Sequence, residues 1–330
     1  MQRFKSSFLL RPFVRSRLFI SQCNRYTTLS TIDDPELVER KGSNTTTLLL
    51  NRPSVLNALN YFTVSRLLQL YSSWEDDPHV RCVVLKGEGR AFCAGGNVIN
   101  TYNMIKKGNI DDCKELYQKI YSLAYVIGTY LKPQVALLNG ITMGGGAAIS
   151  IPGTFCVATE RTDQRKTCSL QSAFICSLCL LLLSIKCHLS YNELSEVLFL
   201  VGFNTNFPGL TFGLLHSNQS SQVFANPETL IGFHPDAGAS FYLSNLPGYL
   251  GEYLALTGDK LSGAEMMSCG LATHYSLSER LPLIEEQLGK LMMDDPSVIG
   301  NCLAKFEDVG HLDQMSVFQR CCSSCAAISN

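Results

Sequence analysis

Two carboxylates in the second half of the chain have neighbours that suit them to acid–base chemistry. Glu228 and Asp236 stand eight residues apart within the stretch 227–238. Their neighbours are proline, glycine and apolar residues, and an apolar setting raises the pKa of a carboxyl group toward neutral pH. Such a group can accept or donate a proton near physiological pH. For either residue alone, the alternative is a helix cap or a charge on the surface.

A glycine triplet, Gly144-Gly145-Gly146, follows an apolar stretch that we predict to be a strand. Glycine lets a ligand approach the main chain because no Cβ atom intrudes. A helix that begins at such a turn also offers free N–H groups and the positive end of its dipole. The triplet has neither the spacing of a dinucleotide-binding turn nor the Lys-Ser/Thr of a phosphate loop. It therefore predicts either a ligand-binding turn or only a tight connection between strand and helix.

Four segments, taken in order, resemble the successive motifs of the crotonase superfamily of acyl-CoA enzymes. Residues 51–60 resemble the family's coenzyme A loop, and the other three segments are 92–96, 139–146 and 227–238. The resemblance extends over residues 35–162 and 223–308. It implies an α/β fold, namely the repeated ββα superhelix of the crotonases.

The resemblance also implies roles for single residues. In this superfamily two main-chain N–H groups bind the thioester oxygen as it gains negative charge, and one such donor typically contributes ~3–4 kcal/mol to the transition state. The matching positions are Gly96 and Gly145. Glu228 matches a catalytic glutamate, and Asp236 matches an aspartate of the 3-hydroxyisobutyryl-CoA hydrolase branch. Contacts with coenzyme A or substrate fall to Arg52, Asn57, Ala58, Ala94 and Gly95.

The branch within the family follows from one further position. Enoyl-CoA hydratases carry a first catalytic glutamate two residues after the triplet, where this chain has Ala148. The hydrolase branch lacks that glutamate too. There Glu228 would attack the thioester or activate water, and Asp236 would hold the substrate hydroxyl or serve proton transfers. The resemblance thus implies hydrolysis of a short 3-hydroxyacyl-CoA in valine catabolism, without a cofactor because coenzyme A is part of the substrate. A crotonase-type hydratase or isomerase is the alternative.

The elements that must position these residues are visible as periodic stretches. Apolar, β-branched runs predict strands at 45–50, 80–86 and 134–139. Helical spacing of apolar residues predicts helices at 63–74, 116–130, 240–246, 251–257, 262–271 and 281–292. Strands that alternate with helices favour an α/β fold with largely parallel strands.

The first 32 residues carry six arginines and lysines, and no acidic residue precedes Asp33. A basic, serine-rich start without acids is typical of an organellar transit peptide. We therefore predict that residues 1–32 are a transit peptide and that the protein is located in the mitochondrial matrix. A disordered basic tail is the alternative.

Residues 163–222 interrupt the crotonase-like pattern, which runs on without a break if Thr162 is joined to Val223. The interruption is rich in Leu, Ser, Phe and Cys, which T-rich introns encode. We hypothesise that it is a retained intron, translated in frame between the core segments 33–162 and 223–309. A transcript without these codons is then expected to be the abundant one, and sequencing that finds none would refute the hypothesis.

Two segments raise questions of location and activity. The uncharged run 173–185 is thirteen residues long, shorter than the ~20 residues of a membrane span. We therefore do not expect it to cross a membrane, although a span that includes its flanks is an alternative. Residues 310–330 resemble no segment of the family, and we interpret them as an aberrant tail produced by truncation or a shifted frame. Because of the insert 163–222 and the tail 310–330, the sequence does not establish whether this form is active.

Composition limits the partners. The chain has a net charge of −1 and 46% hydrophobic residues, so we expect no affinity for nucleic acid. Its 14 cysteines lack the setting of a zinc site, and we predict no metal. The expected partner is an acyl-CoA, and a homo-oligomer is left open. Some plant relatives of the hydrolase branch are structural proteins of the mitochondrial ribosome, so a non-catalytic ribosomal subunit is a further alternative.

Overall fold

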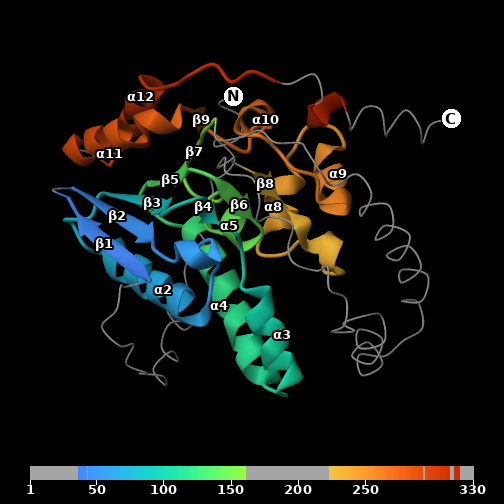
Figure 1. Ribbon diagram of the computed structural model, residues 1–330. Coiled ribbons are helices and arrows are strands. Elements are labelled where there is room, and N and C mark those ends of the chain that lie inside the picture. The colour runs from blue at the N-terminus through green and yellow to red at the C-terminus, as the bar shows by residue number, and fades with distance from the viewer. Residues whose placement is uncertain (1–35, 43, 161–222, 293, 313–315, 320–330) are drawn as a thin grey trace. The chain divides into compact units, whose positions relative to one another are not determined.

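The computed structural model describes residues 36–42, 44–160, 223–292, 294–312 and 316–319. The chain divides into two units, Met1–Pro35 and Glu36–Asn330, and every described residue belongs to the second. The predicted transit peptide and the predicted insert lie outside the described residues, as does much of the segment 310–330. Figure 1 shows the described part, in which helices surround two sheets.

The larger sheet has six strands in the order β1-β2-β3-β5-β7-β9. β1 (Leu37–Lys41) runs antiparallel to β2 (Thr45–Leu50), and all other neighbours in this sheet are parallel. The remaining strands are β3 (Cys82–Gly87), β5 (Gln134–Leu138), β7 (Phe155–Ala158) and β9 (His274–Tyr275). The expected α/β fold with largely parallel strands is confirmed.

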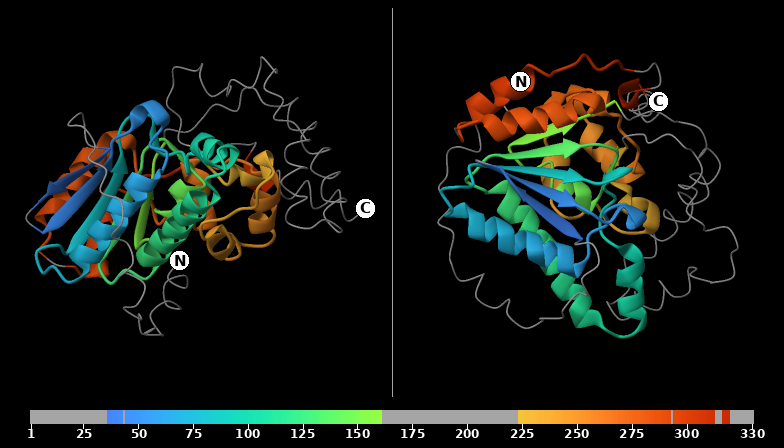
Figure 2. Two further views of the ribbon diagram at one scale, coloured as in Figure 1. Left: turned by 90° about the horizontal axis from the view of Figure 1, so that it is seen from below. Right: turned by 60° about the vertical axis from the view of Figure 1, so that its left-hand side comes forward.

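Both faces of the central strands are buried, which explains the apolar runs in their sequences, such as residues 82–85 of β3 and 135–138 of β5. In β3, Val83 and Leu85 belong to one core cluster, and Cys82 and Val84 to another. The first cluster includes residues of α2 (Tyr61–Glu75) and α4 (Ile110–Gly128), and the second includes residues of α11 (Leu281–Lys290) and α12 (Pro296–Ala304). Figure 2 shows these two helix pairs on opposite faces of the sheet.

The smaller sheet consists of β4 (Ala91–Cys93), β6 (Ile141–Met143) and β8 (Phe224–Ala225), which are all parallel. The chain sends one strand to each sheet in turn: β3 then β4, β5 then β6, β7 then β8. A helical segment follows each pair, namely α3 (Val98–Lys106) with α4, then α5 (Gly145–Ala148), then η3 (Pro227–Ile231). This repeat is the ββα arrangement that the motifs predicted.

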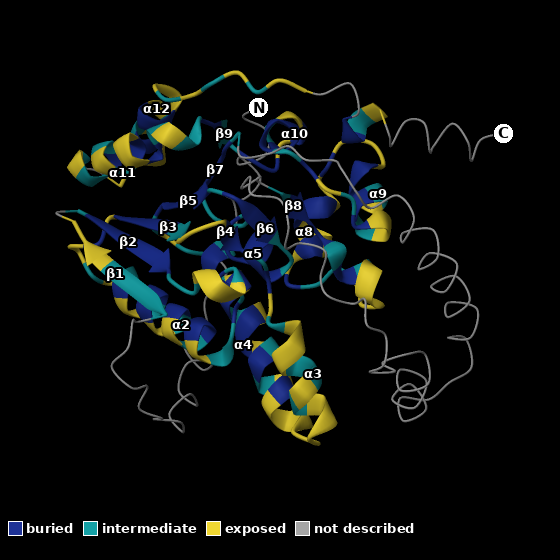
Figure 3. Cartoon of the chain, in the orientation of Figure 1, coloured by how far each residue is buried: buried dark blue, intermediate teal, exposed yellow. Residues whose placement is uncertain are grey.

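The remaining elements are η2 (Pro53–Val55), α8 (Ala239–Leu243), α9 (Leu250–Thr257), α10 (Gly263–Cys269) and η4 (Ser278–Arg280). The start of α10 is fixed by a capping box that Ser262 and Glu265 form. Figure 3 shows the contrast between the buried strands and α3, which has no buried residue. None of the helices that the structure describes is long and apolar enough to cross a membrane.

Candidate active site

The three parallel strands of the smaller sheet end at one edge, and a predicted site residue follows each of them. Gly96 comes after β4, Gly145 after β6 and Glu228 after β8. Carboxyl ends of parallel strands meet at the same edge of a sheet, so residues far apart in the sequence come together there. The N–H of Gly144 donates to the carbonyl oxygen of Ala225 at 3.2 Å and joins the last two turns.

The turns after β4 and β6 lie against each other, and this contact requires glycine. A Cβ atom on Gly146 would lie 2.2 Å from the carbonyl oxygen of Cys93, and one on Gly145 would lie 3.3 Å from the amide nitrogen of Gly96. Gly95 has a φ of +99°, and a Cβ atom there would lie 3.4 Å from the amide nitrogen of Gly145. The amides of Gly96 and Gly145 are therefore close neighbours.

These two amides are free in the part of the chain that the structure describes. The main-chain hydrogen bonds outside regular helices and strands include none donated by Gly96 or Gly145. Gly145 is the first residue of α5, where an N–H group has no acceptor within the helix. An acceptor atom that gains negative charge, such as a thioester oxygen, is the natural partner for such a pair.

The loop that follows β2 holds the turn of Gly95 and Gly96 in place. The N–H of Leu59 donates to the carbonyl oxygen of Gly95 at 2.7 Å, and the carbonyl oxygen of Leu59 accepts from the N–H of Asn97 at 3.0 Å. This short ladder extends from the coenzyme A loop predicted at 51–60 to the first of the two free amides.

Asn57 ties that loop to the protein. Its Nδ2 donates to the carbonyl oxygens of Glu88 at 2.9 Å and Ala91 at 2.7 Å, and its Oδ1 accepts from the N–H of Arg52 at 2.8 Å. Asn57 is 2% exposed, and its main chain has a φ of +55°, in the left-handed region. Its polar atoms are thus used within the protein.

Replacing Asn57 with Ala is expected to destabilise the fold by about 2–4 kcal/mol, because three hydrogen bonds are lost and buried carbonyl groups remain without a donor. The free energy of unfolding in urea measures the effect. Asn103→Ala is the matched control, because Asn103 is exposed on α3 and surface changes usually stay within ±0.5 kcal/mol. Equal stability of the two variants would contradict the role of Asn57.

The other predicted coenzyme A residues lie in the same region. The guanidinium of Arg52 donates to the carbonyl oxygen of Ala58 at 2.9 Å and lies 3.3 Å from the carboxylate of Glu36. The N–H of Ala94 donates to the carbonyl oxygen of Leu56 at 3.0 Å. The structure thus brings these residues together around the loop, and their contacts with coenzyme A stay a prediction.

η3 places Glu228 in a buried position, 8% exposed. Burial raises the pKa of Glu228 to about 7; the charge of Asp236 adds to the rise, and the nearby side chain of Asn226 opposes it. No hydrogen bond of normal geometry reaches either carboxylate oxygen from the described residues. A Cβ atom on Gly144 would lie 2.8 Å from Oε1 of Glu228. A carboxyl group that titrates near neutral pH therefore lies against the residue next to Gly145.

Asp236 lies in the loop between η3 and α8 and is partly exposed. Its Oδ2 accepts a hydrogen bond from the phenol of Tyr121 on α4 at 3.2 Å. Burial raises the pKa of Asp236, and the hydrogen bond from Tyr121 and the charge of His234 oppose that rise. The charge of Asp236 also raises the pKa of Glu228, as expected for two carboxylates of one site.

Sequence reasoning missed three residues beside these carboxylates. Asn226 and Tyr242 are buried, and Nδ2 of Asn226 donates to the Tyr242 hydroxyl at 2.8 Å. The third is Tyr121. The position of Asn226, two residues before Glu228, could have singled it out. Tyr121 and Tyr242 lie on helices, and the sequence around each does not indicate its hydrogen-bond partner.

Ala148, at the position where hydratases of the family carry a glutamate, lies in α5 and is fully buried. In the described part of the chain, no group of three or more His, Cys, Asp or Glu side chains could hold a metal ion. Buried cysteines among the described residues are Cys82, Cys93, Cys113, Cys156, Cys269 and Cys302. The described site offers the main-chain amides of Gly96 and Gly145 and the carboxylates of Glu228 and Asp236.

The sequence matches the family model of enoyl-CoA hydratase/isomerase over residues 45–164 and 218–329, more than half of the chain. The chain belongs to the enoyl-CoA hydratase/isomerase family. The predicted relation to the crotonase superfamily is thereby confirmed. The unmatched stretch 165–217 lies within the insert predicted at 163–222, and the match extends over most of the segment 310–330.

Solved structures of this family have the same fold. An enoyl-CoA hydratase from Rhodobacter sphaeroides matches with a TM-score of 0.62 and 22% identity, and a carnitinyl-CoA dehydratase from Mycobacterium thermoresistibile with 0.62 and 25%. Each match covers 87% of this chain and 64% of the other. The predicted crotonase-like fold is confirmed.

Curated family members from Arabidopsis thaliana are similar in sequence. The mitochondrial 3-hydroxyisobutyryl-CoA hydrolase-like protein 1 is 44% identical over 94% of this chain and 64% of its own length. Small ribosomal subunit protein mS47 is 42% identical over 87% and 56%, and 3-hydroxyisobutyryl-CoA hydrolase 1 is 39% identical over 86% and 59%. The chain thus spans between 56% and 64% of the length of these relatives.

Proposed function

We propose that this chain hydrolyses a short-chain 3-hydroxyacyl-CoA thioester and that the substrate is 3-hydroxyisobutyryl-CoA of valine catabolism. The observation that carries the proposal is the buried carboxyl group of Glu228, with a pKa of about 7, beside the free amides of Gly96 and Gly145. Ala148 favours hydrolysis over hydration, because hydratases of the family use a second glutamate at that position. The relative named 3-hydroxyisobutyryl-CoA hydrolase 1 supports the substrate.

The reaction would split the thioester with one water molecule into 3-hydroxyisobutyrate and coenzyme A. Ionised Glu228 attacks the carbonyl carbon to form an anhydride that water then opens, or it removes a proton from the attacking water. In both routes the carbonyl oxygen becomes negative, and each amide of Gly96 and Gly145 would stabilise it by ~3–4 kcal/mol. In the nucleophilic route the C–S bond breaks as the anhydride forms, and the thiolate of coenzyme A takes up a proton from the water that opens the anhydride. In the base route the C–S bond breaks after water has attacked, and the thiolate takes up the proton that Glu228 removed from that water. Asp236 would hold the 3-hydroxyl of the substrate.

We propose the mitochondrial matrix as the location. The basic, acid-free start at residues 1–32 supports it, and so do relatives that are named as mitochondrial. Import into isolated mitochondria, with cleavage near residue 32 read by N-terminal sequencing, tests this part of the proposal. A protein that stays outside and full length would contradict it.

A ribosomal role is the second candidate, favoured by the 42% identity to small ribosomal subunit protein mS47. In that role the fold would serve as a structural subunit, and the carboxylates would have no chemical task. Sedimentation of a mitochondrial extract separates the two candidates. Migration of the protein with the small ribosomal subunit at high salt supports the structural role, and migration with free matrix enzymes supports the catalytic one.

The direct test is the release of free thiol from 3-hydroxyisobutyryl-CoA by the purified 330-residue chain and by a form without residues 163–222. A 2-enoyl-CoA serves as the second substrate, because hydration removes its conjugated absorbance. We expect thiol release and no hydration. Hydration of the enoyl thioester without thiol release would overturn the assignment as a hydrolase.

A further inference from the structure

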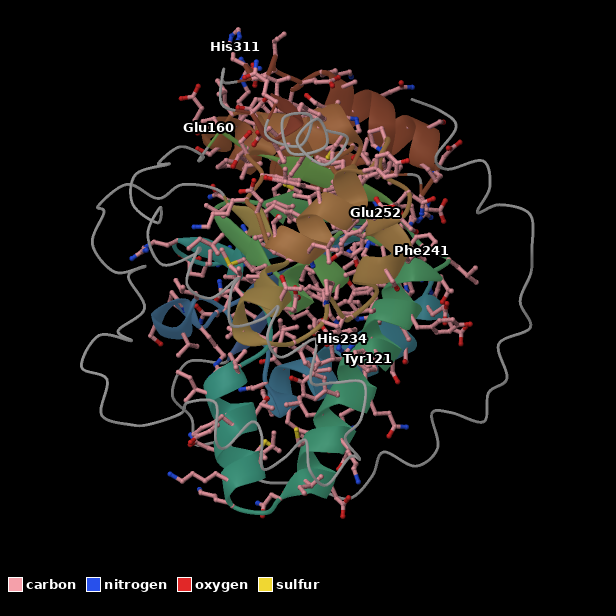
Figure 4. All side chains as sticks on the ribbon, turned by 90° about the vertical axis from the view of Figure 1, so that its right-hand side faces the viewer. Tyr121, Glu160, His234, Phe241, Glu252 and His311 are labelled. Carbon is pink, nitrogen blue, oxygen red and sulfur yellow. The ribbon has the colours of Figure 1, made fainter. Side chains whose placement is uncertain are left out.

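The helix α4 contributes a tyrosine to the candidate site from a part of the sequence that the family motifs do not include. The phenol of Tyr121 donates to Oδ2 of Asp236 at 3.2 Å, although the two residues are 115 positions apart. Figure 4 labels Tyr121 on α4 and His234 on the loop between η3 and α8, which also carries Asp236. Tyr121 is 43% exposed, so it lies outside the buried core, and its hydroxyl is directed at Asp236.

Aromatic contacts join the same face of α4 to the loop. The ring centroids of Tyr117 and Tyr121 are 6.1 Å apart, those of Tyr117 and Phe233 are 6.2 Å apart, and those of Phe233 and His234 are 4.4 Å apart. Pairs at such separations contribute beyond the area that they bury. The pair Tyr117–Phe233 therefore anchors the part of the loop that precedes Asp236 to α4.

One residue of this loop that is not a glycine, Ala237, has its main chain in a sparsely populated conformation. Gly232 and Gly238 have φ values of +74° and +88°, and Ala237, directly after Asp236, has a φ of +48°. A residue with a Cβ atom pays ~1–2 kcal/mol for the left-handed region. Such a conformation persists only where surrounding contacts determine it.

We infer that Tyr121 is a positioning residue for the proposed thioesterase, and that its hydroxyl holds the carboxylate of Asp236 toward the 3-hydroxyl of the substrate. The inference rests on the proposed function, in which Asp236 contacts that hydroxyl. Tyr121 acts through Asp236, and the aromatic contacts of Tyr117 with the loop keep the hydrogen bond within reach. The role predicts a preference: Tyr121 matters for thioesters with a 3-hydroxyl and not for those without one.

Titratable groups around Asp236 influence its pKa, and a titration of Asp236 reports their combined effect. They are Glu228 on η3, His234 on the same loop, Tyr117 and Tyr121 on α4, and Tyr242 on α8. A phenol that donates to a carboxylate favours the ionised form, so its removal raises the pKa of Asp236. A single net hydrogen bond corresponds to a shift of roughly 0.4–1 pH unit.

The test compares Tyr121→Phe with Tyr125→Phe in the full chain. Tyr125 lies one turn further along α4 and is 54% exposed, so it is a matched control. The side-chain carboxyl of Asp236 is followed by carbon-13 NMR during a pH titration and assigned with Asp236→Asn. We expect the midpoint to rise in Tyr121→Phe alone. A midpoint equal to that of the wild type would overturn the inference, whether or not the chain hydrolyses thioesters.

Kinetics then separates positioning from a merely structural role. In Tyr121→Phe, kcat/KM for 3-hydroxyisobutyryl-CoA is expected to fall about fivefold to tenfold, the equivalent of one net hydrogen bond, while that for isobutyryl-CoA stays unchanged. Equal losses on both thioesters, or no loss on either, would overturn the positioning role. A wild-type chain without hydrolysis would refute the proposed function instead, and the NMR midpoint would then decide the contact between Tyr121 and Asp236.

Discussion

Replacing Glu228 with Gln is expected to lower kcat for thioester hydrolysis on the order of 10³-fold, because the variant has neither a base nor a nucleophile at this position. Gln has nearly the same size and shape, so binding of the thioester is expected to persist. Release of free thiol under saturating substrate measures the loss. Release at the rate of the wild type would refute the catalytic role of Glu228.

The pH profile of the wild type is the companion to that variant. Glu228 must be ionised to act as base or nucleophile, and its pKa is raised to about 7. We therefore expect kcat/KM to rise with pH, to reach half of its plateau at about pH 7 and to level off above about pH 8. A profile that is already flat from about pH 5, near the ordinary range of a glutamate, would contradict the burial of this group in the working enzyme.

The same group makes the fold less stable at high pH, which provides a test without substrate. The unfolded chain ionises Glu228 near 4.5 and the folded chain near 7, so stability falls as pH rises between these values and is lowest above the second. The difference corresponds to about 3 kcal/mol. Compared with the wild type, Glu228→Gln is expected to gain about that much between pH 4 and pH 8 in urea unfolding. A stability difference that does not vary with pH would contradict the raised pKa.

Gly146→Ala is expected to have the second large effect. The new Cβ atom would lie 2.2 Å from the carbonyl oxygen of Cys93, a main-chain atom that cannot turn aside. The turns after β4 and β6 must then separate, and the amides of Gly96 and Gly145 separate with them. Loss of one oxyanion donor costs about 10²- to 10³-fold in kcat, and the forced contact costs about 2–3 kcal/mol of stability.

Gly300→Ala is the matched control for this change. Gly300 lies within α12, and a Cβ atom there would lie 3.5 Å from Cε1 of Phe155, an ordinary contact. Ala is favoured over Gly in a helix by about 0.5–1 kcal/mol. We expect wild-type kcat and equal or higher stability in urea. A folded Gly146→Ala variant with the activity of this control would show that the two turns need not touch.

Elements with strong local signals could be predicted from the sequence. The strand expected at 45–50 is β2, and the helix expected at 281–292 is α11, which ends at Lys290. Helix α4 begins at Ile110, before the expected residue 116, because its first turn is exposed and has no apolar period. Helix α12 was missed, although Asp295 and Pro296 at its start are typical N-terminal residues. β9 has two residues and exists only through its pairing with β7.

Site residues that belong to sequence motifs could also be predicted, whereas those defined by tertiary contacts could not. Motif resemblance placed Gly96, Gly145 and Glu228, and the parallel order of β4, β6 and β8 explains why these residues meet. It did not find Tyr121, because an exposed tyrosine on a helix looks like any other surface residue until its partner is known. Nor did it reveal that the side chain of Asn57 is used within the protein. Contacts across 115 residues, such as that of Tyr121 with Asp236, depend on the tertiary fold.

One measurement tests most directly whether the two amides and the carboxylate form a thioester site. 3-Hydroxyisobutyryl-CoA labelled with carbon-13 at the thioester carbonyl is bound to the slow variant Glu228→Gln, and the carbonyl stretch is recorded by difference infrared spectroscopy. Two hydrogen bonds from Gly96 and Gly145 polarise the carbonyl, so its stretch is expected at lower wavenumber than in free solution. It should return toward the solution value when Gly146→Ala is added. A thioester that binds with an unshifted carbonyl stretch would contradict the arrangement.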